Sequence, residues 1–184
     1  MKLHLIRHAR TAANSKGLLA CDPEEPLNSN GTQQAELLAK YLKKLSFDEI
    51  WCSPLLRARQ TLEPFTECTQ VQPQYLSLLC EGQLNLDSSA PILDPELLSE
   101  SGLPVDSESV GCFRGRVAAF LSQIRALDAE KTLLCLTHGH FIRETLNILL
   151  SATNYTRFPI GNCSDTLVEL GKDQIIHYVN RTTI

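Results

Sequence analysis

The sequence lacks several features that would place the protein in a special class. Its 184 residues hold no apolar run long enough to cross a membrane, no internal repeat and no low-complexity tract. We expect no cleavable leader, because the first residues already read as a core strand. With 43% hydrophobic and 21% charged residues, the composition is that of an ordinary globular protein. We therefore expect a single domain over residues 1–184.

An excess of positive charge is also absent. Seventeen lysines and arginines face 21 aspartates and glutamates, which gives a formal net charge of −4. A general nucleic-acid binder carries a basic surface, so we expect no nucleic-acid partner. A small anionic substrate remains compatible with this charge, because a few convergent cations can bind it.

The seven cysteines include no C-x-x-C pair. This spacing argues against a zinc ribbon and against a redox dithiol. Cys52 and Cys135 stand inside apolar runs, which is typical of small buried residues in a reduced compartment. We expect a cytoplasmic protein without membrane association, and the sequence leaves its oligomeric state open.

Two apolar runs of strand length each end in a histidine. Residues 2–8 read K-L-H-L-I-R-H, and residues 131–138 read K-T-L-L-C-L-T-H. Runs this short suit buried strands, and ligands of open α/β sheets bind beyond the carboxyl ends of the strands. The sequence therefore predicts one site that contains His8 and His138, with Arg7 beside them.

Segments with helical spacing alternate with segments of strand character. We expect helices at 29–42, from 55 to about 63, from near 106 or 107 through 124, and from 141 to about 150, and further strands at 49–52, 75–79, 166–170 and 174–179. This alternation favours a three-layer α/β/α sandwich with a mostly parallel central sheet and an antiparallel edge. Residues 83–105 are interrupted by prolines and are expected to form a lid or insertion over the site.

Capping residues mark where the helices begin. We expect Asn28 or Ser29 to cap the first helix, and Glu108 to lie in the first turn of the third. With Ser53 as the cap of the second helix, Arg57 and Arg59 would lie near an amino terminus that favours anions. The pattern alone does not choose between these two arginines.

Several motifs in order carry a resemblance to a known family. Residues 7–14 read R-H-A-R-T-A-A-N, residues 27–35 read L-N-S-N-G-T-Q-Q-A, residues 53–61 read S-P-L-L-R-A-R-Q-T, and residues 138–143 read H-G-H-F-I-R. Shorter matches are the S-E-S of 107–109, the R-V of 116–117 and the N-C-S of 162–164. Together they resemble the histidine phosphatase superfamily in its phosphoglycerate mutase-like branch, which includes small α-ribazole phosphatase-like enzymes. The resemblance covers nearly the whole chain.

The resemblance implies roles for the residues around the two strand ends. His8 would be the nucleophile and form a phosphohistidine, while Arg7 and Arg57 clamp the phosphoryl oxygens and His138 donates to them. The motif at 53–61 selects Arg57 rather than Arg59. The family uses no metal and no other cofactor, so we expect none here.

The general acid rests on a shorter match. Residues 79–81 read L-C-E and keep only the opening of the family's L-x-E-x-x-x-G-x-W-E-G stretch. Glu81 is therefore the expected acid, which would then serve as the base that activates water. Asp87, Asp94 and Glu96 are the competing carboxylates.

Three further positions are expected to bind substrate. Thr11 and Asn14 would add side-chain contacts after the first strand, and Gly139 would leave room for the phosphoryl group. Ala9 stands where the family has glycine. This change is expected to be tolerated unless the backbone there needs a positive φ.

The resemblance implies a metal-independent phosphatase that hydrolyses a small phosphorylated metabolite. A phosphoglycerate mutase-type phosphoryl transfer is the alternative within the family, although mutases carry longer insertions. A phosphatase that acts on phosphohistidine in a protein is a third reading. An inactive phosphate-binding regulatory relative is the fourth, since the acid stretch is poorly matched. Specificity would lie in the loops at 82–105 and 151–160.

Overall fold

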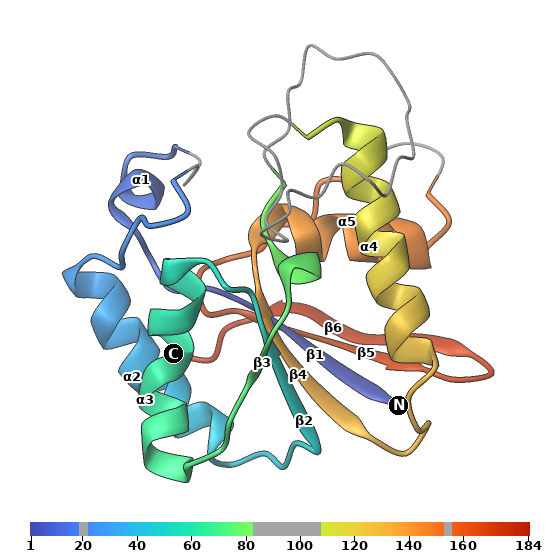
Figure 1. The fold of residues 1–184 in the computed structure, drawn as a ribbon, viewed down its shortest axis with the longest axis horizontal. Helices are drawn as coiled ribbons and strands as arrows, with labels where there is room; N and C mark the ends of the chain where they lie inside the picture. Colours follow the sequence, from blue (N-terminus) through green and yellow to red (C-terminus); the bar gives the residue numbers. More distant parts are fainter. Residues whose placement is uncertain (19–21, 83–107, 153–155) are drawn as a thin grey trace.

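The computed structural model describes residues 1–18, 22–82, 108–152 and 156–184 (Figure 1). The predicted lid and the three competing carboxylates lie outside these residues. The strands are β1 (Lys2–Arg7), β2 (Glu49–Cys52), β3 (Gln74–Tyr75), β4 (Thr132–Thr137), β5 (Asp165–Leu170) and β6 (Gln174–Arg181). The helices are α1 (Ala12–Ser15), α2 (Ser29–Leu42), α3 (Leu56–Thr69), the 3₁₀ turn η1 (Ser77–Leu79), α4 (Val110–Arg125) and α5 (Gly139–Leu149).

The strands form one sheet in the order β3-β2-β4-β1-β5-β6. The four strands from β3 to β1 run parallel, and β5 and β6 add an antiparallel edge. This confirms the predicted mostly parallel sheet. The order places β1 and β4 side by side in the middle, so their carboxyl ends open at the same edge.

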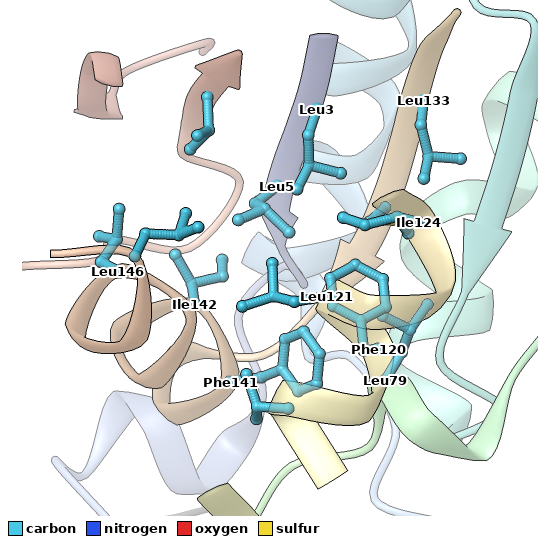
Figure 2. Close-up of a cluster of buried hydrophobic side chains, with 14 of the residues drawn as sticks. Leu3, Leu5, Leu79, Phe120, Leu121, Ile124, Leu133, Phe141, Ile142 and Leu146 are labelled. Carbon is cyan, nitrogen blue, oxygen red and sulfur yellow. The ribbon is translucent and has the colours of Figure 1, made fainter. Parts of the chain in front are cut away.

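Helices cover both faces of the sheet because residues of the central strands alternate between the faces. Leu3, Leu5 and Leu133 pack with residues of α4 and α5, as Figure 2 shows for Phe120 and Phe141. The alternate residues of β1 and β4 pack on the other side with α2 and α3. In the described ranges, no helix is long and apolar enough to span a bilayer.

The second predicted helix differs from the structure at both ends. Helix α3 starts after Leu55 rather than after Ser53, and it continues to Thr69 although Pro64 lies inside it. Proline removes one helical hydrogen bond. Phe65 is buried beyond the proline, and its packing keeps the segment helical. Ser53 is therefore not the N-cap of this helix, as had been predicted, and its hydroxyl contacts His138.

The bounds of other elements also needed correction. The predicted strand at 75–79 is strand only to Tyr75 and continues into η1. Helix α4 begins at Val110, and Ser109 caps it by accepting a hydrogen bond of 3.1 Å from the Cys112 amide. Glu108 therefore precedes the helix instead of lying in its first turn. Asn28 caps α2 as predicted, because its Oδ1 accepts from the Gly31 amide at 2.9 Å.

Candidate active site

The two predicted histidines meet at the carboxyl edge of the central strands. Arg7 and Thr137 are partners in the β1–β4 register, and the residue after each is histidine. The His8 amide donates to the Thr137 carbonyl at 2.9 Å. The rings of His8 and His138 lie with their centroids 5.1 Å apart. The parallel pairing thus brings together residues that are far apart in the sequence.

The protonation state of His8 follows from its hydrogen bond. Its Nδ1 lies 2.7 Å from the Ala9 carbonyl, and since a carbonyl can only accept, Nδ1 must carry the hydrogen. Burial, with the positive charges of Arg57 and Arg7, lowers the pKa of His8 well below its ordinary value. The ring is therefore neutral and keeps the lone pair on Nε2. A neutral imidazole with its lone pair available is a nucleophile.

His138 is held by a side chain rather than by the backbone. Its Nε2 lies 2.8 Å from Ser53 Oγ, and its Nδ1 is buried without a hydrogen-bond partner among the described residues. Burial, followed by the charge of Arg57, lowers its pKa well below the ordinary value. If Ser53 donates its hydroxyl hydrogen to Nε2, the proton of the neutral ring is on Nδ1. This nitrogen can then donate to an anion in the site.

Two buried guanidinium groups flank the histidines. Arg57 is 1% exposed and donates through Nη1 to the Asp22 carbonyl at 3.0 Å. Arg7 donates through Nη1 to the Ile160 carbonyl at 2.7 Å, while its Nε is buried without a partner among the described residues. By contrast, Arg59 is largely exposed and lies 3.8 Å from Glu24. The structure thus puts Arg57, and not Arg59, beside the two histidines.

The guanidinium of Arg7 lies in a field of mixed charges. Burial lowers the pKa of Arg7, the carboxylate of Glu81 opposes that shift, and Arg143 and Arg57 reinforce it. Burial of unneutralised positive charge favours binding of an anion, because the anion restores the interactions that desolvation removed. The site is therefore suited to a phosphoryl group.

Glu81 approaches the site from the segment after η1. Its Oε1 accepts from the His140 amide at 3.1 Å and from the Gly82 amide at 3.3 Å. Among the described residues, Oε2 has only the longer contact of 3.4 Å to the His140 amide. The carboxyl group is thereby fixed against the start of α5.

The loop after β1 is built by its own polar side chains. Thr11 caps α1 and accepts from the Asn14 amide at 3.3 Å. Asn162 donates through Nδ2 to the His8 carbonyl at 2.9 Å and to Asn14 Oδ1 at 3.1 Å. The sequence motif at 162–164 had given Asn162 no role. It ties the backbone of His8 to the loop.

Small residues leave space beside the charged groups. A Cβ added at Gly139 would lie 3.4 Å from Arg7 Nε, where it would cover the unpartnered nitrogen. Ala9 is fully buried, and it is not among the described residues with positive φ. The departure from the family's glycine at this position therefore causes no backbone strain.

Two other histidines pair with carboxylates, and a buried cysteine is unreactive. His4 Nδ1 lies 2.9 Å from Asp165 Oδ2, and His177 Nε2 lies 2.9 Å from Glu169. Burial raises the pKa of Cys163 to about 12, so its thiol is not a nucleophile near neutral pH. Over the described parts of the chain, no group of three or more His, Cys, Asp or Glu side chains could hold a metal ion.

Sheet order and edge residues together define a phosphoglycerate mutase-like α/β protein with an anion site built from histidine and arginine. Comparison with known proteins assigns the family. The family model for the histidine phosphatase superfamily (branch 1) matches residues 3–181. The chain belongs to this superfamily.

The similar proteins are phosphatases. A probable phosphatase of Schizosaccharomyces pombe is 43% identical over 156 residues, which are 78% of this chain and 75% of the relative. The adenosylcobalamin/α-ribazole phosphatase of Salmonella typhimurium is 30% identical over 149 residues, which are 75% and 74% of the two chains. The solved structure of a phosphoserine phosphatase mutant from Entamoeba histolytica with phosphoserine has a TM-score of 0.76 and 27% identity, and covers 99% of this chain and 97% of that one. The family predicted from the motifs is thus confirmed.

Proposed function

We propose that the protein is a metal-independent phosphatase that hydrolyses a small phosphomonoester through a phosphohistidine at His8. The observation that carries the proposal is the hydrogen bond from His8 Nδ1 to the Ala9 carbonyl at 2.7 Å. It fixes the neutral tautomer whose Nε2 lone pair can attack phosphorus. The phosphatases among the relatives support the same reaction class.

In the first step, His8 Nε2 forms a bond to phosphorus while the ester oxygen–phosphorus bond breaks. Arg7 and Arg57 neutralise the charge on the equatorial oxygens, and His138 Nδ1 donates to the same oxygens. Glu81, protonated, gives its proton to the leaving alkoxide, so the alcohol departs neutral.

In the second step, water attacks the phosphohistidine. The carboxylate of Glu81 takes a proton from the water, an oxygen–phosphorus bond forms and the nitrogen–phosphorus bond breaks. Inorganic phosphate leaves, and both His8 and Glu81 return to their starting protonation states. Thr11, Asn14 and Gly139 are assigned to substrate binding. Gly139 lies beside Arg7 Nε, Asn14 is linked to the His8 carbonyl through Asn162, and Thr11 caps the helix that carries Asn14.

The substrate class follows from the site and the relatives. Arginines and a donor histidine recognise the phosphoryl group that all phosphomonoesters share, and the similar solved structure holds phosphoserine. We propose a small phosphorylated metabolite of the cytoplasm as the substrate.

The experiment is phosphate release from a panel of phosphomonoesters with a chelator present. Wild type is compared with His8→Ala and Glu81→Gln. We expect turnover by wild type, none by His8→Ala, and a loss of about 10²- to 10⁴-fold in Glu81→Gln. Near-normal activity of Glu81→Gln would move the acid to Asp87, Asp94 or Glu96.

The alternatives predict other results. Interconversion of 3- and 2-phosphoglycerate without phosphate release would indicate a mutase. Binding of phosphate without turnover of any ester would indicate an inactive regulatory relative. Release of phosphate that depends on an added divalent metal would contradict the proposed mechanism.

A further inference from the structure

The segment that carries Glu81 is shaped by side chains of other elements. Turn η1 ends at Leu79, and residues 80–82 belong to no helix or strand. Buried backbone groups outside regular structure need partners from elsewhere. Here four successive carbonyls, those of residues 78–81, accept hydrogen bonds from only two side chains, Arg116 and Thr137. These side chains therefore determine where the segment lies.

Arg116 supplies three of the four hydrogen bonds. Its Nη1 donates to the carbonyls of Leu78 at 2.9 Å and Cys80 at 2.8 Å, and its Nη2 lies 3.5 Å from the Glu81 carbonyl. Thr137 Oγ1 donates to the Leu79 carbonyl at 2.7 Å. One guanidinium from α4 thus holds the backbone on both sides of Leu79, and at Glu81 itself.

Glu108 fixes the orientation of that guanidinium. Arg116 Nε donates to Glu108 Oε1 at 3.0 Å and Nη2 donates to Oε2 at 2.6 Å, so the pair is bidentate. The two side chains are only 4% and 7% exposed. With the two Glu108 contacts and the three carbonyl contacts, every N–H of the guanidinium has an acceptor. Lysine could not reproduce this planar set of five donors.

A packing contact supports the same placement. A Cβ added at Gly82 would lie 2.9 Å from Phe113 Cδ2, so only glycine lets the chain after Glu81 lie against α4. The guanidinium carbon of Arg116 lies 5.0 Å from the centroid of the Phe113 ring. The segment is therefore bound to α4 through both polar and apolar contacts.

We propose that Arg116, oriented by Glu108, is the positioning residue for Glu81. The inference rests on the proposed role of Glu81 as general acid. Arg116 touches no reacting atom in this proposal. It places the acid by holding the carbonyls of residues 78, 80 and 81, and a displacement of about 1 Å at a catalytic group can cost about 10²-fold in rate.

A leaving-group comparison separates positioning from folding. An alkyl phosphate needs a proton on its departing oxygen, whereas p-nitrophenolate departs readily without one. The parameter kcat/KM covers the steps up to departure of the alcohol, so the later hydrolysis of the phosphohistidine does not affect it. Loss of folded enzyme lowers kcat/KM equally for both esters.

The test uses Glu108→Gln, Arg116→Lys and the paired variant Glu108→Leu with Arg116→Met. The paired variant removes both charges together, since a buried charge left without its partner can prevent folding. The matched control is the second paired variant, Arg114→Met with Glu144→Leu, which removes another ion pair of α4, 2.6 Å long, that forms no hydrogen bond with residues 78–81. Glu81→Gln provides the reference for full loss of the acid.

We expect Glu108→Gln and the paired variant to lose about 10- to 100-fold in kcat/KM for glycerol phosphate, and less than about threefold for p-nitrophenyl phosphate. Arg116→Lys should fall between wild type and the paired variant. Amide hydrogen exchange at residues 79–82 should be faster in these variants than in the paired Arg114 and Glu144 control, and this readout does not depend on activity.

Two results would overturn the inference: equal losses for both esters, or exchange at residues 79–82 as slow as in the control. Glu81→Gln could instead keep full activity while exchange is faster in the variants. In that case the hydrogen bonds of Arg116 do order this segment, and the assignment of Glu81 as the acid is wrong. The two failures are therefore distinguishable.

Discussion

The two histidines of the site occupy equivalent strand ends but are held in different ways. His8 is fixed by the backbone, through its Nδ1 and the Ala9 carbonyl. His138 is fixed by a side chain, through its Nε2 and Ser53 Oγ. A carbonyl can only accept, whereas a hydroxyl can donate or accept. The first contact therefore determines the tautomer by itself, and the second depends on what else binds the serine.

This difference matches the two proposed roles. A nucleophile needs a lone pair that stays on one nitrogen, and a backbone acceptor provides that regardless of neighbouring side chains. A donor to the phosphoryl oxygens needs its proton on the nitrogen that faces them. Ser53 orients that proton when its hydroxyl hydrogen points to Nε2 rather than to Cys80 Sγ, which lies 3.9 Å away, while its oxygen accepts from the Leu55 amide at 3.4 Å.

The largest effects are expected when each histidine is replaced in turn, because the two variants should differ in whether a phosphoenzyme forms. His8→Ala should form no acid-labile phosphoenzyme, because no nitrogen remains to attack phosphorus. His138→Ala should still form it, with kcat/KM lower by about 10²- to 10³-fold, the usual cost of losing one donor to developing charge. Rapid quench into alkaline detergent after mixing with ³²P-labelled substrate measures the phosphoenzyme, and loss of the label on later acid treatment identifies it as a phosphohistidine. A phosphoenzyme in His8→Ala would exchange the two assignments.

Ser53→Ala should have a smaller effect, because it removes only the partner of His138. We expect kcat/KM to fall by about 10-fold, while His8 still forms its bond to phosphorus. Ser53→Thr keeps the hydroxyl and should recover most of the loss. If both variants retain full activity, the tautomer of His138 does not depend on this hydroxyl.

Both buried histidines should make stability depend on pH. Their pKa values are lowered in the folded protein, whereas an unfolded chain has histidine near a pKa of about 6.5. Below that value the unfolded state binds protons that the folded state does not, so the free energy of unfolding decreases as the pH falls. Urea midpoints measured from about pH 7.5 to about pH 5 should show this decrease. A double variant, His8→Gln with His138→Gln, should flatten the slope, and an unchanged slope would place its origin elsewhere.

Ala9→Gly should have the smallest effect. The Ala9 carbonyl that holds His8 is a backbone group and survives the change, so activity should remain within about twofold. Stability should fall by about 1 kcal/mol, because glycine makes the unfolded chain more flexible and Ala9 is fully buried. Thermal unfolding measures the loss. A large drop in activity would mean that the Cβ helps to orient the nucleophile.

The sequence predicted the parts of the site that depend on short-range pattern. Apolar runs ending at His8 and His138 predicted the two central strands, and the pairing of Arg7 with Thr137 follows once those strands are neighbours. The family motif selected Arg57 rather than Arg59, and the structure buries the first and leaves the second exposed. Such features depend on residues that are consecutive in the sequence, so they can be predicted without knowledge of the fold.

The predictions that failed concern side chains whose partners lie on other elements of the fold. Ser53 was predicted to cap a helix, since serine before proline is typical of a cap, but the helix begins only at Leu56 and the shorter contact of Ser53 is with His138. Glu108 was predicted to interact with a helix dipole, yet it pairs with Arg116. In both cases one local pattern allows two partners, and only the tertiary arrangement selects between them.

The sheet order also determines when activity can arise during folding. Strand β1 pairs with β4 and with β5, so Lys2 finds its partners at Thr132 and Glu169. Contacts over such sequence separation form slowly, because the long loop between them must close first. During synthesis both edges of β1 therefore stay unpaired until most of the chain, including β4 and β5, has been made. Recovery of phosphatase activity on refolding should follow the slowest pairing of the sheet rather than the formation of helices.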